Sequence, residues 1–167
     1  MTRVFLSLGS NIRPELHLKQ AVEQLRSRCR VLAVSPVYET RPIGPDGAPT
    51  AGQPNFLNAA VLIETDLDAT TLKSRTLRPI EEELGRERQG KFAPRTIDLD
   101  IILFGSQVLD LDGRHIPDPN LLRHAHIARP LADLEPAFRH PEAGRTLAEI
   151  AAALPHPDIT PRPDVSL

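Results

Sequence analysis

The feature that most constrains this chain is an apolar run at residues 97–104 that carries two aspartates, Asp98 and Asp100. Its β-branched and aliphatic residues favour a strand that is buried on at least one face. Because side chains alternate along a strand, the two carboxylates face the same way, about 7 Å apart. Two like charges at that spacing, among Ile and Leu, are costly unless a cation lies on them. The run therefore predicts both a sheet strand and a site for positive charge.

Basic residues directly before this strand are the candidate partners: Arg86, Arg88, Lys91 and Arg95. One interpretation is a structural ion-pair cluster between Arg95 and the two aspartates at the strand end. The other is a site in which carboxylates hold divalent metal and arginines hold phosphate, which suits phosphoryl transfer from a nucleotide. The density of basic residues favours the second interpretation.

Length, charge and cysteine content limit the class of protein. The 167 residues suit a single domain, residues 1–167, with a full core. A formal net charge of −2 gives no reason to expect nucleic acid or another polyanion as a partner. The single cysteine, Cys29, excludes an internal disulfide and fits a reducing compartment. The apolar run at residues 4–8 is too short for a signal peptide or a membrane span, so we expect a cytoplasmic protein without a membrane partner.

Hydrophobic periodicity predicts an α+β protein with a β-α-β-β-α-β core. We expect strands and helices, in this order, at residues 4–8, 14–28, 31–37, 56–65, 66 or 68 to 84, and 97–104. Pro79 predicts a kink in the second helix or its division into two shorter helices. The order is that of a ferredoxin-like fold, for which we expect a mixed four-stranded sheet with both helices on one face.

A C-terminal extension of a hairpin and a short helix follows this core. Gly105 and Ser106 predict a turn, with residues 108–111 pairing back on the preceding strand. Thr146 begins a capping box that predicts a short helix to Leu154. Residues 155–167 contain four prolines and are expected to form a loose tail.

The segment at residues 38–54, rich in proline and glycine, is expected to be a loop, and loops of this length are usually functional or disordered. Asn58, shortly after it, is a polar residue among apolar ones. It is either a structural amide with its hydrogen bonds satisfied or a group that reads the hydrogen-bonding edge of a ligand.

Two other patterns do not indicate a site. Gly85, Gly90 and Lys91 have P-loop spacing, but residue 92 is Phe where Ser or Thr would bind Mg²⁺, and a helix precedes the glycines instead of following them. His124 and His126 are regularly spaced, yet histidines on a loop are more often surface residues than metal ligands.

Five longer motifs together resemble one family, the 6-hydroxymethyl-7,8-dihydropterin pyrophosphokinases (HPPK) of folate biosynthesis. The motifs are LGSN at 8–11, SPVYET at 35–40, FLNAAV at 56–61, EEELGR at 81–86 and APRTIDLDII at 93–102. The P-R-x-x-D-[LIV]-D pattern within the last motif is specific to the family, and the resemblance extends over nearly the whole chain.

The resemblance implies transfer of pyrophosphate from ATP to the hydroxymethyl group of the pterin, with release of AMP. Two Mg²⁺ ions would be held by Asp98 and Asp100, with Arg86 and Arg95 completing the catalytic set. The implied ATP-binding residues are Glu81, Arg86, Arg88, Lys91, Arg95, Ile101, His115 and Asp118. The implied pterin-binding residues are Thr40, Pro42, Ile43, Phe56, Asn58, Phe92 and His126. Other folate-pathway enzymes are the implied protein partners.

The chain departs from the family pattern at three of these positions. Phe92 stands where Trp is common, Asp118 stands where a His near the phosphates is usual, and His126 stands where a Phe usually stacks on the pterin. The changes at Asp118 and His126 motivate one alternative, a diverged family member that acts on another hydroxymethyl compound. A second alternative, of a different class, is a ferredoxin-like ligand-binding module without catalysis.

Overall fold

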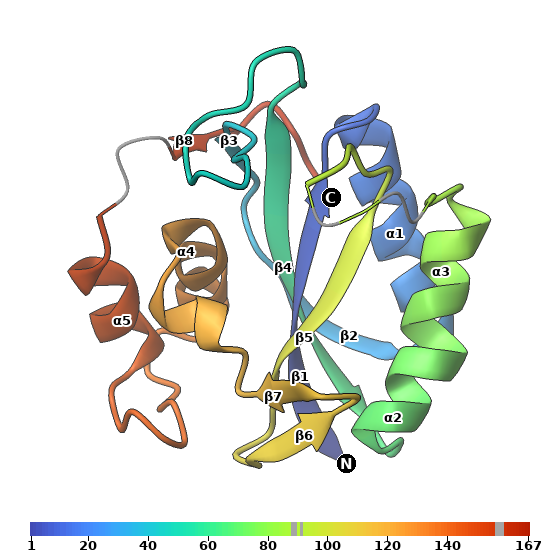
Figure 1. Cartoon of the computed structure of the whole chain (residues 1–167). Helices are drawn as coiled ribbons and strands as arrows, with labels where there is room; N and C mark the ends of the chain where they lie inside the picture. Colours follow the sequence, from blue (N-terminus) through green and yellow to red (C-terminus); the bar gives the residue numbers. More distant parts are fainter. Residues whose placement is uncertain (88–89, 91, 156–158) are drawn as a thin grey trace.

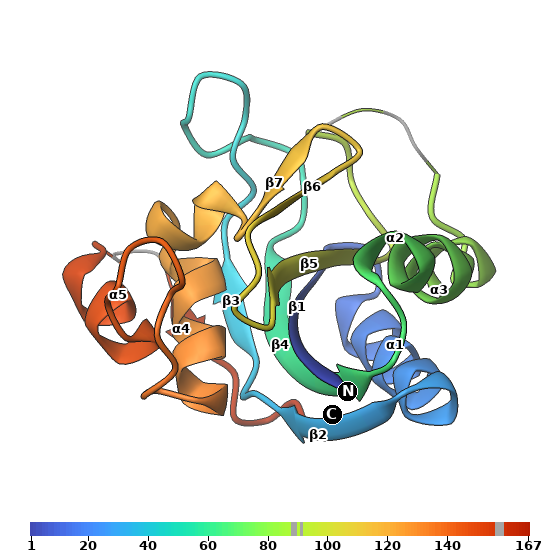
Figure 2. The same ribbon diagram turned by 90° about the horizontal axis from the view of Figure 1, so that it is seen from below.

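The computed structural model of the chain is an antiparallel sheet with helices on both faces (Figures 1 and 2). It describes residues 1–87, 90, 92–155 and 159–167. The helices and strands are β1 (Thr2–Ser10), α1 (Pro14–Arg28), β2 (Arg30–Val34), β3 (Tyr38–Thr40), β4 (Phe56–Thr65), α2 (Ala69–Leu72), α3 (Arg78–Glu83), β5 (Asp98–Phe104), β6 (Leu109–Leu111), β7 (Arg114–Ile116), α4 (Ala125–Leu134), α5 (Leu147–Ala153) and β8 (Thr160–Pro161). Within the described residues, none of the helices is both long enough and apolar enough to cross a bilayer.

The main sheet has the order β5-β1-β4-β3-β8, and β2 also pairs with β4. Each of these pairs is antiparallel, so the expectation of a mixed sheet was wrong. Strands β1 and β2, joined by α1, run parallel, but β4 lies between them. Strands β4 and β5 also run parallel, and β1 lies between them. The helical connections therefore skip one strand, and parallel strands are never neighbours.

Two cores form on the two faces of the sheet, because side chains of β1 alternate between them. Val4, Leu6 and Leu8 are fully buried against α1 and the α2–α3 segment. Phe5 faces the opposite core, which is built mainly from α4 and α5. Figure 2 shows the sheet between these two helical layers. Full burial of a side chain of this size contributes roughly 1.5–3 kcal/mol. Because β1 lies between β5 and β4 and has buried side chains on both faces, it is the centre of the fold.

The helical segment before β5 is divided, as Pro79 predicted. Asp68 caps α2, since its Oδ1 accepts a hydrogen bond of 2.8 Å from the Thr71 N–H. A π-helical turn (Lys73–Leu77) follows, and Pro79 lies in the first turn of α3, where its missing N–H is tolerated. Gly85, at φ 79°, ends the segment.

The strand expected at 31–37 corresponds to β2 alone, which ends at Val34, before Pro36. Tyr38 to Thr40, assigned to a loop from the sequence, form β3 and pair with Asn58 to Phe56 of β4. The prediction that residues 108–111 pair with the preceding strand was also wrong. Strand β6 pairs with β7 and not with β5. Asp112 and Gly113, with φ values of 55° and 79°, make the turn between them.

The described part of the C-terminal segment is not a loose tail. Strand β8 pairs with β3, and the Arg162 N–H donates to the Val37 carbonyl at 2.8 Å. Val165 and Leu167 pack against the main core. Proline is tolerated in a strand at a sheet edge, which is where β8 places Pro161.

Candidate active site

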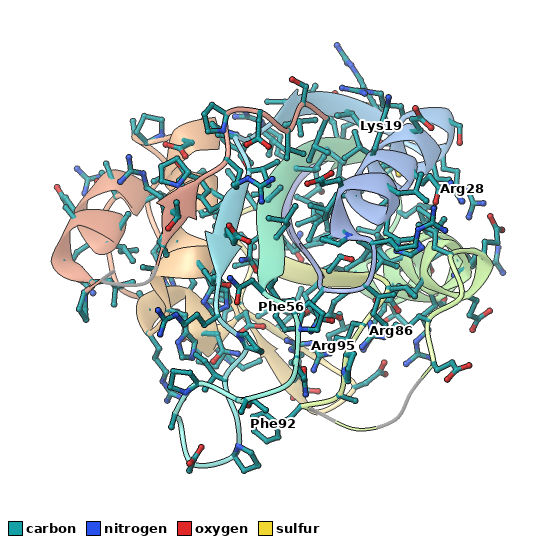
Figure 3. All side chains as sticks on the ribbon, turned by 90° about the horizontal axis from the view of Figure 1, so that it is seen from above. Lys19, Arg28, Phe56, Arg86, Phe92 and Arg95 are labelled. Atoms are coloured by element: carbon teal, nitrogen blue, oxygen red, sulfur yellow. The ribbon has the colours of Figure 1, made fainter. Side chains whose placement is uncertain are left out.

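Asp98, at the start of β5, is held by two arginines from the preceding loop. Its Oδ1 accepts a hydrogen bond of 2.7 Å from Arg86 and its Oδ2 one of 2.5 Å from Arg95. Buried Glu81, on α3, also pairs with Arg86 and accepts a 2.9 Å hydrogen bond from the Leu99 N–H. Figure 3 shows Arg86 and Arg95 at the same end of the sheet. Glu81 thus fixes Arg86 to the backbone of β5.

Asp100 is held by an arginine that the sequence did not indicate. Arg114, on β7, donates to Asp100 Oδ1 at 2.7 Å and lies 2.9 Å from Asp118 Oδ2. Asp118 is only 1% exposed, and its Oδ1 also accepts from the Asn120 N–H. The Asp118 carboxylate therefore holds Arg114 in place and does not stand alone in the site.

The pKa of Asp100 is raised to about 6, mainly because the group is buried and further because Asp98 is negative; Arg114 opposes the shift. One arginine therefore does not fully compensate the charge. An additional cation at this position would favour the ionised carboxylate.

The donor set fits magnesium. Among the described residues, no group of three or more His, Cys, Asp or Glu side chains is arranged to hold a metal. Mg²⁺ commonly uses one or two carboxylates and takes its other ligands from substrate phosphates and water. Asp98 and Asp100 supply these carboxylates, so the residues present suit a metal that arrives with a polyphosphate.

Two adjoining cavities, of about 370 and 820 Å³, share Asp98 and Asp100 in their walls. The larger cavity has the more charged lining, whereas the lining of the smaller one is mainly uncharged, although it includes Arg41 and Arg123. Those that line only the larger cavity include Lys73, Arg78, Glu81, Arg86, Arg114 and Asp118. Those that line only the smaller cavity include Thr40, Pro42, Phe56 and Asn58. The two carboxylates therefore lie where a charged and an uncharged ligand would meet.

Asn58 lines the smaller cavity from β4. Its Nδ2 donates to Thr40 Oγ1 at 2.8 Å and to the Tyr38 carbonyl at 3.4 Å. It is 6% exposed. The amide has structural partners and also borders the cavity, so its geometry is compatible with both interpretations made from the sequence.

Three rings, those of Phe92, His124 and His126, border both cavities. His126 is kept neutral at pH 7, because burial, aided by the neighbouring charge of His124, lowers its pKa to about 4. A neutral imidazole can stack on a flat ring without a charge penalty. Phe92 is 41% exposed, and its carbonyl accepts from Gln53 at 3.0 Å. Figure 3 shows Phe92 farther out than Phe56.

Asn11, which was not predicted as a site residue, holds the backbone of Arg95 in place. Its Oδ1 accepts from the Arg95 N–H at 2.7 Å, and its own N–H donates to the Arg95 carbonyl at 3.0 Å. Its Nδ2 donates to Gln53 at 3.3 Å. Asn11 thus connects the end of β1 to the loops before β4 and β5. In the sequence, only the position of Asn11 at the end of the LGSN motif indicated that it belongs to the site.

Two of the expected ATP-binding residues line neither cavity. His115 follows Arg114 on β7, so it faces the other way and pairs with Glu142 at 2.6 Å. Ile101 is 4% exposed and lies in the main core. Arg88 and Lys91 lie outside the described residues. The other site residues named from the sequence line one cavity or both.

A carboxylate pair bordered by arginines, where a more charged cavity meets a less charged one, is the arrangement expected of an enzyme that transfers a phosphoryl-type group from a polyphosphate. The model of one family, 7,8-dihydro-6-hydroxymethylpterin-pyrophosphokinase (HPPK), matches residues 5–136. The chain belongs to this family.

Individual relatives agree with the family match. A 2-amino-4-hydroxy-6-hydroxymethyldihydropteridine pyrophosphokinase from Pseudomonas aeruginosa is 40% identical over 140 residues, which are 82% of this chain and 83% of the relative. The protein of the same name from Bacillus subtilis is 38% identical over 133 residues, 78% of this chain and 76% of the relative. A Plasmodium falciparum HPPK-DHPS structure superposes with a TM-score of 0.71 over 90% of this chain and 45% of that longer chain. At 15% identity, this last similarity shows the fold alone.

Proposed function

We propose that this chain transfers pyrophosphate from ATP to the hydroxymethyl oxygen of 6-hydroxymethyl-7,8-dihydropterin in folate biosynthesis. The oxygen bonds to the β-phosphorus, the bond from that phosphorus to the α,β-bridging oxygen breaks, AMP leaves, and the hydroxyl proton is released. The observation that carries the proposal is the position of Asp98 and Asp100 in the shared wall of the two cavities. The family relatives supply the substrate names.

The larger cavity is the proposed ATP side. Arg86 and Arg95, from the loop before β5, and Arg114, from β7, surround the carboxylates, and guanidinium groups suit phosphate oxygens. All three are paired with carboxylates before a ligand binds. Binding of the polyphosphate would therefore exchange carboxylate oxygens for phosphate oxygens around arginines that are already in position.

Asp98 and Asp100 are the proposed ligands of two Mg²⁺ ions. Bound magnesium would neutralise phosphate charge and lower the pKa of the attacking hydroxyl. The residues of this chain would contribute by orientation, since transfer of this kind depends on positioning and electrostatics and needs no covalent intermediate.

The smaller cavity is the proposed pterin side. Asn58 and Thr40 would read the polar edge of the ring, because an amide offers both a donor and an acceptor. Phe56, neutral His126 and Phe92 would contact its faces, and Pro42 and Ile43 would line its edge. The described parts of the loops before β4 and β5, which the Gln53–Phe92 hydrogen bond connects, would exclude water from the transferring group.

The finer description of the fold is also a proposal. Residues 1–167 would form one domain with a ferredoxin-like core, supported by the order β5-β1-β4 with β2 and β3 on the far edge of β4. The shared core of α1 and the α2–α3 segment supports it too. A cytoplasmic location fits the single cysteine. The HPPK-DHPS relatives suggest folate-pathway enzymes as partners.

Steady-state release of AMP tests the proposal. We expect release only when ATP, Mg²⁺ and 6-hydroxymethyl-7,8-dihydropterin are all present, with pyrophosphorylated pterin formed in equal amount. An AMP rate that is the same with and without the pterin would overturn it. That result would favour the diverged family member that uses another hydroxymethyl compound.

A further inference from the structure

The C-terminal strap, which we define as residues 159–167, is not explained by the family match, because that match ends at residue 136. The strap returns to the smaller cavity from beyond α5. Ile159 lines that cavity, as does Pro155, together with Phe56 and Asn58. No strap residue is among the described residues that line the larger cavity.

Backbone pairing fixes the strap to β3. Strand β8 pairs Tyr38 with Pro161 and Glu39 with Thr160. The Arg162 N–H then continues the contact to the Val37 carbonyl. Strand β3 lies between β4 and β8 in the sheet, and Figure 1 shows β8 beside it. The strap therefore closes the sheet edge that carries Thr40, the hydrogen-bond partner of Asn58.

Side chains add a second attachment. The Arg162 guanidinium lies 3.0 Å from Glu15 on α1 and 3.5 Å from Glu39 on β3, and it also pairs with Asp164 at 2.8 Å. Single exposed ion pairs contribute little, but this one cation joins three segments. Val165 and Leu167 pack against the main core on the same strap. The position of Ile159 is thus determined from its C-terminal side by backbone, charge and apolar contacts together.

We propose that Ile159 is a substrate-positioning residue, an apolar wall against the pterin ring, and that the strap, anchored through Arg162, keeps this wall in place. The inference rests on the proposed function, because it takes the smaller cavity to be the pterin side. It assigns a role in pterin binding, and none in ATP binding, to a segment outside the matched residues.

Ile159→Ala tests the wall while leaving the anchor intact. We expect the Kd and KM for 6-hydroxymethyl-7,8-dihydropterin to rise about 3- to 10-fold, in line with the apolar contact that is removed. The Kd for a non-hydrolysable ATP analogue with Mg²⁺ should not change. Val108→Ala is the matched control, since Val108 is 53% exposed and lines neither cavity. If the Ile159→Ala variant has the same Tm as the wild type and binds the pterin with an unchanged Kd, the proposal is overturned.

Arg162→Ala tests the anchor. We expect the same rise in pterin Kd with an unchanged ATP-analogue Kd, and partial restoration by Arg162→Lys. Arg26→Ala, which alters an exposed arginine on α1, is the control. A lower Tm with an unchanged pterin Kd would show that the strap serves stability alone, which overturns the proposal.

The wild-type assay separates the two hypotheses. If the wild type releases no AMP with this pterin, the proposed function fails, whatever the variants do. If the wild type turns over normally and Ile159→Ala binds pterin as tightly, only the role of the strap fails.

Discussion

The two cavities that meet at Asp98 and Asp100 are stabilised in different ways. In the larger cavity, charges from α3, β5, β7 and the loop before β5 already form ion pairs with one another, as in the Asp100–Arg114–Asp118 chain. In the smaller cavity, uncharged groups such as Asn58 and Thr40 are held by strand pairing and short hydrogen bonds. A charged ligand in the larger cavity must therefore replace existing ion pairs. An uncharged ring can bind in the smaller cavity with little rearrangement of the residues that line it. This contrast makes changes in the two cavities separable by experiment.

The largest effect should come from removing one carboxylate. Asp98→Asn or Asp100→Asn should lower kcat/KM by about 10³-fold, because the proposed metal site loses a charge at the point of transfer, while the pterin Kd changes little. AMP release and pterin titration measure the two quantities. Asp66→Asn, which changes an exposed carboxylate near the N-terminus, is the control. Equal losses in pterin binding and in turnover would contradict the separation of the two cavities.

Asp100 should also lower the stability of the ligand-free protein. Its pKa is raised to about 6 in the fold, above the unfolded value of about 3.9. The folded state therefore binds the extra proton, and the free energy of unfolding should fall as the pH rises from about 4 to 6, by at most about 3 kcal/mol.

Denaturant unfolding of wild type and Asp100→Asn across pH 4 to 8 measures this effect. The variant should be more stable than the wild type at pH 7, and this advantage should shrink towards pH 4, where the wild-type Asp100 is protonated. A constant difference at every pH would argue against the raised pKa.

Arg114 should have the next largest effect. Arg114→Met should raise the KM for ATP about 10- to 50-fold, because it removes a proposed phosphate contact and leaves buried Asp118 unpaired. Arg114→Lys should restore part of the affinity. Arg139→Met, which alters an arginine that donates to the Gly144 carbonyl, is the control. An increase confined to the KM for the pterin would contradict the assignment of Arg114 to the ATP side.

A change at Asn58 should have the smallest effect, and it should weaken binding of the pterin but not of ATP. Asn58→Leu should raise the pterin Kd about 10-fold, since one polar reader is lost, and leave binding of the ATP analogue unchanged. Because Asn58 also bonds to Thr40, the Tm of the variant has to be measured in parallel. A lower Tm without weaker pterin binding would make this amide purely structural.

Several features were predictable because they depend on local sequence. The periodicity placed α1 at Pro14–Arg28 and β4 at Phe56–Thr65, and both bounds are confirmed. The capping box at Thr146 is confirmed as the start of α5. In each case, neighbouring residues supply the signal: the spacing of apolar side chains, or a hydroxyl three residues before a Glu.

Most of the errors arose where distant segments compete for a partner. The return of β8 to β3 and the antiparallel neighbours of the sheet depend on contacts between segments far apart in the chain. The β6–β7 hairpin is the exception, because Asp112 and Gly113 are a local turn signal that our prediction overlooked. The proline content suggested that the C-terminal segment is a loose tail, but Arg162 in this segment forms ion pairs with acidic residues on α1 and β3. No local pattern contains that information.

The sequence by itself determined the carboxylate pair, its facing direction and the nearby arginines, because strand alternation and charge cost are local properties. Only the tertiary structure decided that Arg114 and not His115 reaches Asp100, that Asp118 is buried beneath it, and that Ile159 lines the smaller cavity. The physical reason is that these contacts join separate strands and loops, whose relative positions follow from packing of the whole core.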